Sequence, residues 1–154
     1  MIAVLQRVRG AAVSVDNKVV GECGEGLYIL LGVSREDSER DAEALAEKIV
    51  NLRIFTDENG KMNLSLLDIN GEMLVVSNFT LLASYRKGKR PDYMGAAAPD
   101  EAKRLYDMFC EACEKRLKRV ERGVFGAHMI SSLETDGPVT IVMDSKVLLS
   151  PKNS

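Results

Sequence analysis

The sequence predicts an α+β fold, and three observations support this prediction. Alternating or continuous apolar runs indicate about seven strands, whereas only two segments carry apolar residues at helical spacing. These helices interrupt the strands in an irregular order, unlike the regular alternation of a doubly wound parallel sheet. The sequence contains no internal repeat and no interdomain linker. We therefore expect a single domain over residues 1–146 and a flexible tail over 147–154.

The first half of the chain predicts paired strands followed by a helix. Strands are expected over residues 1–9, 11–15, 18–22 and 27–33. Asp16-Asn17 predicts the turn of a hairpin. The last of these strands is apolar on both faces, which is typical of a central strand. Apolar residues at helical spacing over about 37–52 predict the first helix, with Ser34 and Asp37 as candidate N-caps.

The second half predicts three more strands and the second helix. Strands are expected over residues 73–79, 124–133 and 139–144. The helix is expected from Asp100 to about residue 120, ended by Gly123. Turn chemistry at Thr135–Pro138 predicts a tight turn between the last two strands. The tail from Ser145 is expected to be partly disordered.

Composition excludes several classes of protein. The chain has 154 residues, 45% hydrophobic and 29% charged, as in an ordinary globular protein. No apolar run approaches the ~20 residues of a membrane span, and the N-terminal residues alternate like a strand rather than a signal peptide. Three cysteines give no disulfide framework. We therefore expect a cytoplasmic protein without a membrane partner.

The residues that are missing narrow the possible chemistry. The only histidine is His128, and no acid stands at the spacing of a known catalytic triad. The sequence lacks a Walker loop, a dinucleotide-binding glycine motif and a cluster of metal ligands, so we expect no cofactor and no metal. If the protein is an enzyme, catalysis must depend on backbone groups, hydroxyls or the substrate itself.

Polar residues at the end of the apolar strand over 73–79 suggest such a site. Burying them costs free energy unless they are hydrogen-bonded or functional. The residues concerned are Ser77, Asn78, Phe79 and Thr80. Their hydroxyls, amide and backbone N–H groups can form an oxyanion-binding site. The alternative is a strand end that is merely capped by hydroxyls.

Two concentrations of positive charge occur in a chain whose net charge is only −2. The first comprises Arg86, Lys87, Lys89 and Arg90, and the second spans residues 115–122. Each is either a local contact for nucleic-acid phosphates or a solvated surface, because local rather than net charge decides such contacts.

Two motifs, together with further stretches that occur in the same order, resemble a known family. SNFTL at 77–81 resembles SQFTL, and TDGPVT at 135–140 resembles NxGPVT, of the D-aminoacyl-tRNA deacylases. The stretches MIAVLQRVRGAAVSVD, NLRIFTDENGKMNLSLLDINGEMLVVS, RKGKRP and GVFGAHM are similar to that family in the same order and spacing. The resemblance covers about residues 1–145. It implies a dimer in which antiparallel and mixed sheets form a barrel-like arrangement with two main helices.

The resemblance also implies a function. Members hydrolyse the ester that joins a D-amino acid or glycine to the 3′-terminal adenosine of tRNA, with help from the ribose 2′-OH. Gly137-Pro138 would be a cis dipeptide whose carbonyls enter the active site of the other subunit and collide with an L side chain. Arg7 would brace this dipeptide, and Thr140 completes the motif.

The remaining site residues follow from the same resemblance. The backbone N–H groups of Phe79 and Thr80 would stabilise the oxyanion, while Phe125 and Met129 would line the adenosine pocket. Arg86, Lys87, Lys89 and Arg90, together with the helix end over 115–122, are expected to contact phosphates of the acceptor stem. The partners are thus the aminoacyl-tRNA 3′ end and a second copy of the chain, with no DNA.

The sequence departs from the family motifs at two positions. Asn78 replaces glutamine and is one methylene shorter, and Thr135 replaces asparagine. Two alternatives therefore stay open. One is an editing relative with a trans Gly-Pro bond that acts on another mischarged tRNA, and the other is a tRNA 3′-end binding protein with little activity.

Overall fold

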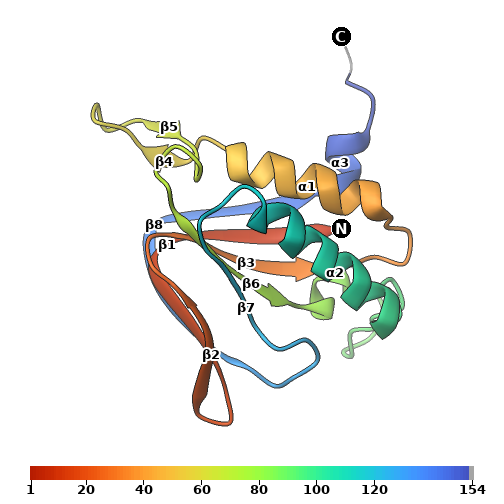
Figure 1. The fold of residues 1–154 in the computed structure, drawn as a ribbon. Helices are drawn as coiled ribbons and strands as arrows, with labels where there is room; N and C mark the ends of the chain where they lie inside the picture. Colours follow the sequence, from red (N-terminus) through yellow and green to blue (C-terminus); the bar gives the residue numbers. More distant parts are fainter. Residues whose placement is uncertain (153–154) are drawn as a thin grey trace.

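The computed structural model describes residues 1–152 and confirms the α+β fold (Figure 1). The final residues of the expected tail, 153–154, lie outside the described part. In chain order the elements are β1 (Ile2–Val15), β2 (Lys18–Cys23), β3 (Gly26–Gly32), α1 (Glu39–Asn51), β4 (Phe55–Thr56), β5 (Met62–Leu64), β6 (Glu72–Ser77), the 3-10 helix η1 (Phe79–Leu82), α2 (Pro99–Glu114), β7 (Val120–Arg122), β8 (Ile130–Asp144) and α3 (Ser145–Leu149).

One mixed, strongly curved sheet forms the centre of the molecule. Its order is β2-β1-β3-β6-β7, and β8 pairs with β1. The β3–β6 and β6–β7 pairs are parallel and the others are antiparallel. The outer strands approach each other where the Glu22 N–H donates to the Glu121 carboxylate at 3.2 Å. The sheet is therefore nearly closed and barrel-like, as expected.

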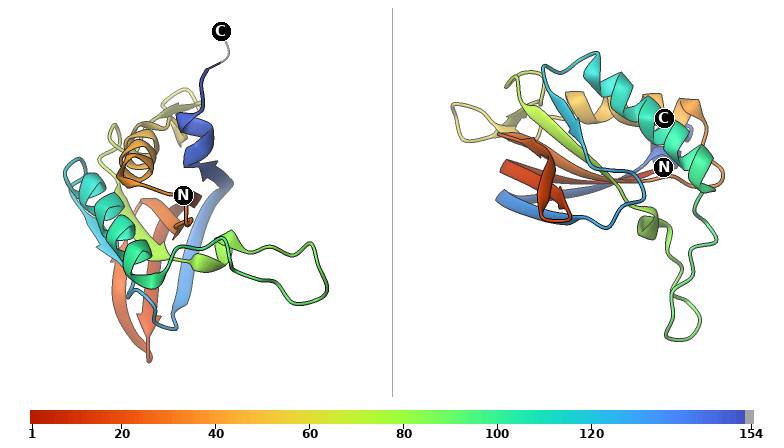
Figure 2. Two further views of the ribbon diagram at one scale, coloured as in Figure 1. Left: turned by 90° about the vertical axis from the view of Figure 1, so that its right-hand side faces the viewer. Right: turned by 60° about the horizontal axis from the view of Figure 1, so that its bottom comes forward.

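The two main helices cover one side of this sheet (Figures 1 and 2). α1 buries Leu45 and Ile49, and α2 buries Leu105 and Phe109, at the three- and four-residue spacings of an apolar helical stripe. They pack over β3, whose residues are almost all buried. The prediction of a covered central strand is confirmed. None of the helices within residues 1–152 is both long and apolar enough to cross a membrane.

β1 contributes to two separate cores because a bulge reverses its faces. Ala3 and Leu5 are buried in the core beneath the helices. The register against β8 then shifts at Arg9, and beyond it Ala11 and Val13 are buried in a second cluster with Tyr28. An inserted residue changes the alternation of side chains, so the strand turns its apolar face from one core to the other.

The prediction of a tight turn at Thr135–Pro138 is wrong. β8 is one continuous strand, and both halves pair antiparallel with β1. Gln6 pairs with Thr140 and Val8 with Thr135, so residues 136–139 bulge out opposite Arg7 alone. The local turn chemistry is present, but the chain does not reverse because both flanks retain the same partner strand. The strand expected to begin at residue 124 begins at Ile130.

The helix expected to reach residue 120 ends at Glu114. The N–H groups of Arg116 and Leu117 both donate to the Cys113 carbonyl at 3.0 Å, which tightens the chain into a turn before β7. Residues 115–122 are thus a turn and a strand rather than a helix end. For α1, the N-cap is Ser38 rather than Ser34 or Asp37, and the Ser38 N–H donates to Asp41.

A buried polar junction joins the start of β1 to α1 and α3. The Met1 ammonium lies 2.6 Å from Asp37 and 2.8 Å from the Ser145 hydroxyl. Ser145 in turn donates to Asp41 at 2.6 Å. Residues 145–149, which the sequence suggested to be the beginning of a disordered tail, form the helix α3.

Candidate active site

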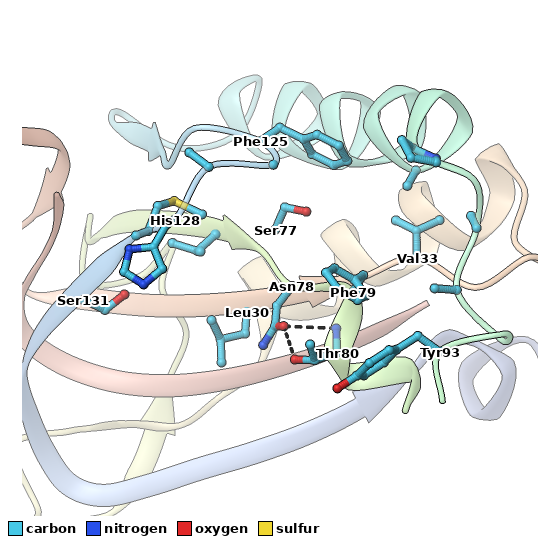
Figure 3. Close-up of a pocket in the computed structure, with 18 of the residues that line it drawn as sticks. Leu30, Val33, Ser77, Asn78, Phe79, Thr80, Tyr93, Phe125, His128 and Ser131 are labelled. Atoms are coloured by element: carbon cyan, nitrogen blue, oxygen red, sulfur yellow. Dashed lines mark hydrogen bonds between the residues drawn. The ribbon is translucent and has the colours of Figure 1, made fainter. Parts of the chain in front are cut away.

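A cavity of about 800 Å³ opens beside the end of β6 (Figure 3). It is lined by residues from β3, η1, the start of α2 and the loop over 123–129. It brings together the polar strand end and both of the residues expected to contact adenosine: Ser77, Asn78, Phe79, Thr80, Phe125 and Met129. Segments almost fifty residues apart in sequence therefore line one cavity.

Asn78 determines the shape of the turn that follows β6. It is the N-cap of η1, and its side-chain oxygen accepts hydrogen bonds from the Thr80 N–H at 3.2 Å and from the Thr80 hydroxyl. One of the two expected oxyanion donors, the Thr80 N–H, is therefore engaged within the chain. No acceptor among residues 1–152 bonds the other, the Phe79 N–H, which leaves this group available to a ligand.

The loop over 123–129 forms the opposite wall. A Cβ at Gly123 would lie only 2.7 Å from the Met129 sulfur, so glycine allows Met129 to approach. The Phe125 ring packs against Tyr106 of α2, with centroids 5.8 Å apart. Tyr106 is held by a buried hydrogen bond from its hydroxyl to the Val75 carbonyl at 2.8 Å. Burial raises the pKa of Tyr106, so this donor stays protonated.

Among the other lining residues, which were not predicted as site residues, four have aromatic or polar side chains. Tyr93 packs edge-on against Phe79 with ring centroids 5.1 Å apart. At the other end, the Tyr28 hydroxyl lies 2.5 Å from the Ser131 hydroxyl. His128 also lines the cavity, exposed and without a hydrogen bond from its ring to residues 1–152. The only sequence signal for Tyr93 was its position next to the basic loop. Tyr28 lies within an apolar strand, where the sequence gave no signal of a site residue.

The Gly137–Pro138 peptide bond is cis, as the resemblance implies. Gly137 has φ +142°, and a Cβ there would lie 2.5 Å from the Val139 nitrogen, so only glycine fits this position. Thr140 donates from its hydroxyl to Gln6 at 2.8 Å and fixes the far side of the bulge.

Arg7, on β1, holds this bulge in place. It is 9% exposed, and its Nε donates to the Asp136 carbonyl at 3.0 Å and lies 3.4 Å from the Asp136 carboxylate. Its Nη1 donates to the Ile54 carbonyl at 2.8 Å. The brace therefore acts on the residue preceding the glycine rather than on the carbonyls of the Gly-Pro dipeptide itself.

Gly137 and Pro138 do not line the cavity of their own chain. Both are exposed on the bulge of β8. The two motifs that identify the family are therefore separated within a single chain.

The basic loop and the basic segment over 115–122 differ in how their charges are paired. Arg86, Lys87, Lys89 and Arg90 are all exposed on a segment that projects from the body (Figure 2). In the second segment, Arg119 pairs with Glu22, Glu72 and Glu121, and Arg122 pairs with Asp107 and Glu114. Acidic neighbours thus compete with phosphate for this second segment, which favours the first as a nucleic-acid contact.

The cysteines do not contribute nucleophiles. Cys23, Cys110 and Cys113 are all free and buried. Burial raises the pKa of Cys23 to about 11 and that of Cys110 to about 12, so both remain thiols near neutral pH. No group of three or more side chains suited to hold a metal ion occurs in the part of the chain that the structure describes.

Known proteins of similar sequence belong to one family. The sequence model of a family described as D-Tyr-tRNA(Tyr) deacylase matches residues 4–144. A D-aminoacyl-tRNA deacylase from Thermosipho africanus is 59% identical over 146 residues, covering 95% of this chain and 98% of the relative. The corresponding protein of Caldicellulosiruptor saccharolyticus is 57% identical over the same shares of the two chains.

Solved structures share the fold. A protein described as c-Myc DNA unwinding element binding protein superposes with a TM-score of 0.89 at 39% identity, covering 99% of this chain and 100% of that one. A probable eukaryotic D-amino acid tRNA deacylase superposes with a TM-score of 0.78 at 20% identity, over 92% and 97% of the two chains.

Proposed function

The chain belongs to the D-aminoacyl-tRNA deacylase family and is an ester hydrolase that deacylates D-aminoacyl-tRNA, and from this premise we propose how it selects and cleaves its substrate. The proposed enzyme is a cytoplasmic homodimer that hydrolyses D-aminoacyl-tRNA and glycyl-tRNA without a metal or cofactor. The products are free tRNA and the free amino acid. The observation that carries the proposal is the cavity that joins the Ser77–Thr80 motif to Phe125 and Met129.

In this mechanism the terminal adenosine lies against Phe125 and Met129, and the ester carbonyl points at the turn after Ser77. Water, assisted by the 2′-OH of the substrate, adds to the carbonyl carbon. The Phe79 N–H stabilises the negative oxygen that forms, while the Thr80 hydroxyl, fixed by Asn78, positions the reacting groups. The ester bond then breaks, and the ribose oxygen leaves with a proton. The proposed reaction thus depends little on ionisable side chains.

Selection between enantiomers is assigned to Gly137-Pro138 of the partner subunit. The dipeptide is exposed, lies outside the cavity of its own chain and is held by Arg7 and the β1–β8 ladder. An L side chain would collide with such fixed backbone, whereas a D side chain points away and glycine has none. Backbone groups suit this task because they do not change rotamer.

The proposed dimer is supported by the outer edge of β8. This strand of 15 residues pairs with β1 on one side only within the described sheet. It also exposes Ile130 and Val142, the latter at 69%. A long exposed apolar edge is a ready template for association.

The test is hydrolysis of D-Tyr-tRNA, L-Tyr-tRNA and Gly-tRNA by the purified protein, with EDTA in a parallel set. The proposal expects cleavage of the D and glycyl esters, sparing of the L ester and no effect of EDTA. Equal cleavage of both enantiomers would refute the backbone filter. Binding of tRNA without cleavage of any ester would favour the alternative of a tRNA-end binding protein, and the first residue to examine would then be Asn78.

A further inference from the structure

A projecting arm over residues 84–92 leaves the body of the molecule shortly after η1 (Figure 2). Reciprocal backbone hydrogen bonds between Ser84 and Asp92, at 2.8 and 2.9 Å, close its base. η1 leads into the arm, and Tyr93, which directly follows it, packs against Phe79 in the cavity wall. The arm therefore begins and ends beside residues that line the cavity.

The arm carries positive charges that the protein leaves unpaired. None of Arg86, Lys87, Lys89 and Arg90 forms an ion pair with residues 1–152, in contrast to the paired arginines of the segment over 115–122. Free cations on an exposed arm attract a polyanion, and this attraction decreases as salt rises.

The arm also carries an aromatic ring that is almost fully exposed. Tyr85 is 82% exposed, more than any other large apolar or aromatic side chain within residues 1–152. Exposed aromatic rings among cations are the combination with which proteins bind single-stranded nucleic acid, because bases stack on the rings while the cations follow the backbone.

We propose that Tyr85 stacks on a nucleobase of the single-stranded segment that immediately precedes the terminal adenosine of tRNA. This inference rests on the proposed function, because an adenosine bound in the cavity is what brings the preceding nucleotides to the arm. Tyr93 lines the cavity next to the base of the arm, so a nucleotide strand that leaves the cavity on this side passes the arm. A single strand fits better than a duplex, since only unstacked bases offer a free face to a ring.

A spectroscopic test is available because the chain contains no tryptophan. Tyr85→Trp places a sole indole on the arm, and Val147→Trp, at a position 72% exposed on α3, is the matched control. Titration with the trinucleotide cytidylyl-cytidylyl-adenosine should quench the fluorescence of the first variant saturably and leave the second unchanged. Adenosine alone should quench neither. An unchanged signal from the arm at saturating trinucleotide, or an equal response of both variants, would overturn the proposal.

Kinetics separate the arm from the cavity. For Tyr85→Ala, we expect KM to rise about five- to tenfold on D-Tyr-tRNA and on the D-tyrosyl trinucleotide, and to stay unchanged on D-tyrosyl adenosine. Tyr85→Phe should behave like the unaltered protein, because it keeps the ring. An equal effect on all three substrates, or an effect on none, would refute the stacking contact. If the unaltered protein cleaves none of them, the proposed function fails instead, while the fluorescence titration still tests the arm.

Discussion

At the scale of single residues, the turn after β6 depends on one amide. The Asn78 side chain accepts from both the N–H and the hydroxyl of Thr80, so a residue shorter than the glutamine of the family motif is used as a helix cap. The cap fixes the turn that carries the Phe79 N–H. The shorter side chain thus contacts both Thr80 groups directly.

Asn78→Ala should lower kcat on D-Tyr-tRNA about tenfold with little change in KM. Losing an N-cap costs about 0.5–2 kcal/mol, and tenfold in rate corresponds to about 1.4 kcal/mol. Steady-state kinetics would show the effect, and Asn78→Asp, which keeps an acceptor oxygen, is the control. A kcat equal to that of the unaltered protein would remove Asn78 from the mechanism.

Gly137→Ala should reduce the preference for D over L esters about tenfold. The added Cβ would approach the Val139 nitrogen at 2.5 Å, and a residue held at positive φ costs about 1–3 kcal/mol, so the bulge must move. The measurement is the ratio of kcat/KM for D-Tyr-tRNA and L-Tyr-tRNA. Gly60→Ala is the matched control, because Gly60 also has a positive φ, +78°, but a Cβ added there would meet no atom within 4 Å. If both variants keep the ratio, the dipeptide is not the filter.

At the scale of elements, α3 depends on contacts that its own sequence does not reveal. Its first residue, Ser145, is buried between the Met1 ammonium and Asp41. Although burial acts to raise the pKa of Asp41, hydrogen bonds from Ser145, Ser38 and Lys146 hold it well below its usual range. A lowered folded-state pKa stabilises the fold above the unfolded value of 3.8, and the stabilisation is lost as pH falls through the folded pKa.

Ser145→Ala should therefore lower the free energy of unfolding by about 1–3 kcal/mol at pH 7, because buried polar groups lose a partner. The difference from the unaltered protein should begin to shrink only below the unfolded value of 3.8, and it should disappear as pH falls through the lowered folded-state pKa of Asp41. Urea denaturation at a series of pH values from 7 down to about 2 would measure the difference and its decline. Ser150→Ala, at an exposed hydroxyl just after the same helix, should have little effect. A difference that does not vary with pH would exclude Asp41 as the cause.

Elements were predicted well where the local sequence and the tertiary contacts agree. The run over 27–33 became β3, and the hairpin turn at Asp16-Asn17 joins β1 to β2, with positive φ at both residues. The segment at Asp136-Gly137-Pro138 was misjudged, because local turn chemistry does not reveal that both flanks pair with the same strand. The end of α2 was misplaced because Leu117 and Val120 continue the apolar helical spacing beyond Glu114.

The site was predicted only in part for the same reason. The Ser77–Thr80 motif, Phe125 and Met129 carried either polar chemistry or a family pattern, and the structure places all of them around one cavity. Tyr28 and Tyr93 line that cavity through folding alone. No local pattern distinguishes a lining aromatic from a core or loop aromatic.

At the scale of the whole molecule, the separation of the cavity from the proposed filter makes a direct prediction about the proposed dimer. Mixing the Asn78→Ala and Gly137→Ala proteins should restore D-selective activity, because the intact cavity of one chain meets the intact dipeptide of the other. Random exchange makes about half of the dimers mixed, each with one complete site, so about a quarter of the original selective activity should return.

The measurement is the D-to-L ratio of the mixture after subunit exchange, compared with the two proteins assayed without exchange. A ratio equal to the weighted sum of the parents would show that each chain filters its own substrate. Sedimentation of the mixture gives the accompanying control for assembly.

The bulge in β8 has a consequence for how such a protein can change over generations. Residues 136–139 stand opposite Arg7, and Arg9 is an extra residue on β1, so the register of residues 130–135 against β1 depends on the length of both excursions. Deleting one codon from this excursion would shift residues 130–135 by one position along β1 and turn Ser131 and Leu133 to the opposite face. The hydrogen bond to Tyr28 would be lost with them. In the proposed mechanism, the length of β8 thus sets the position of the chiral filter, and a single-codon deletion would alter it together with the cavity wall at Ser131.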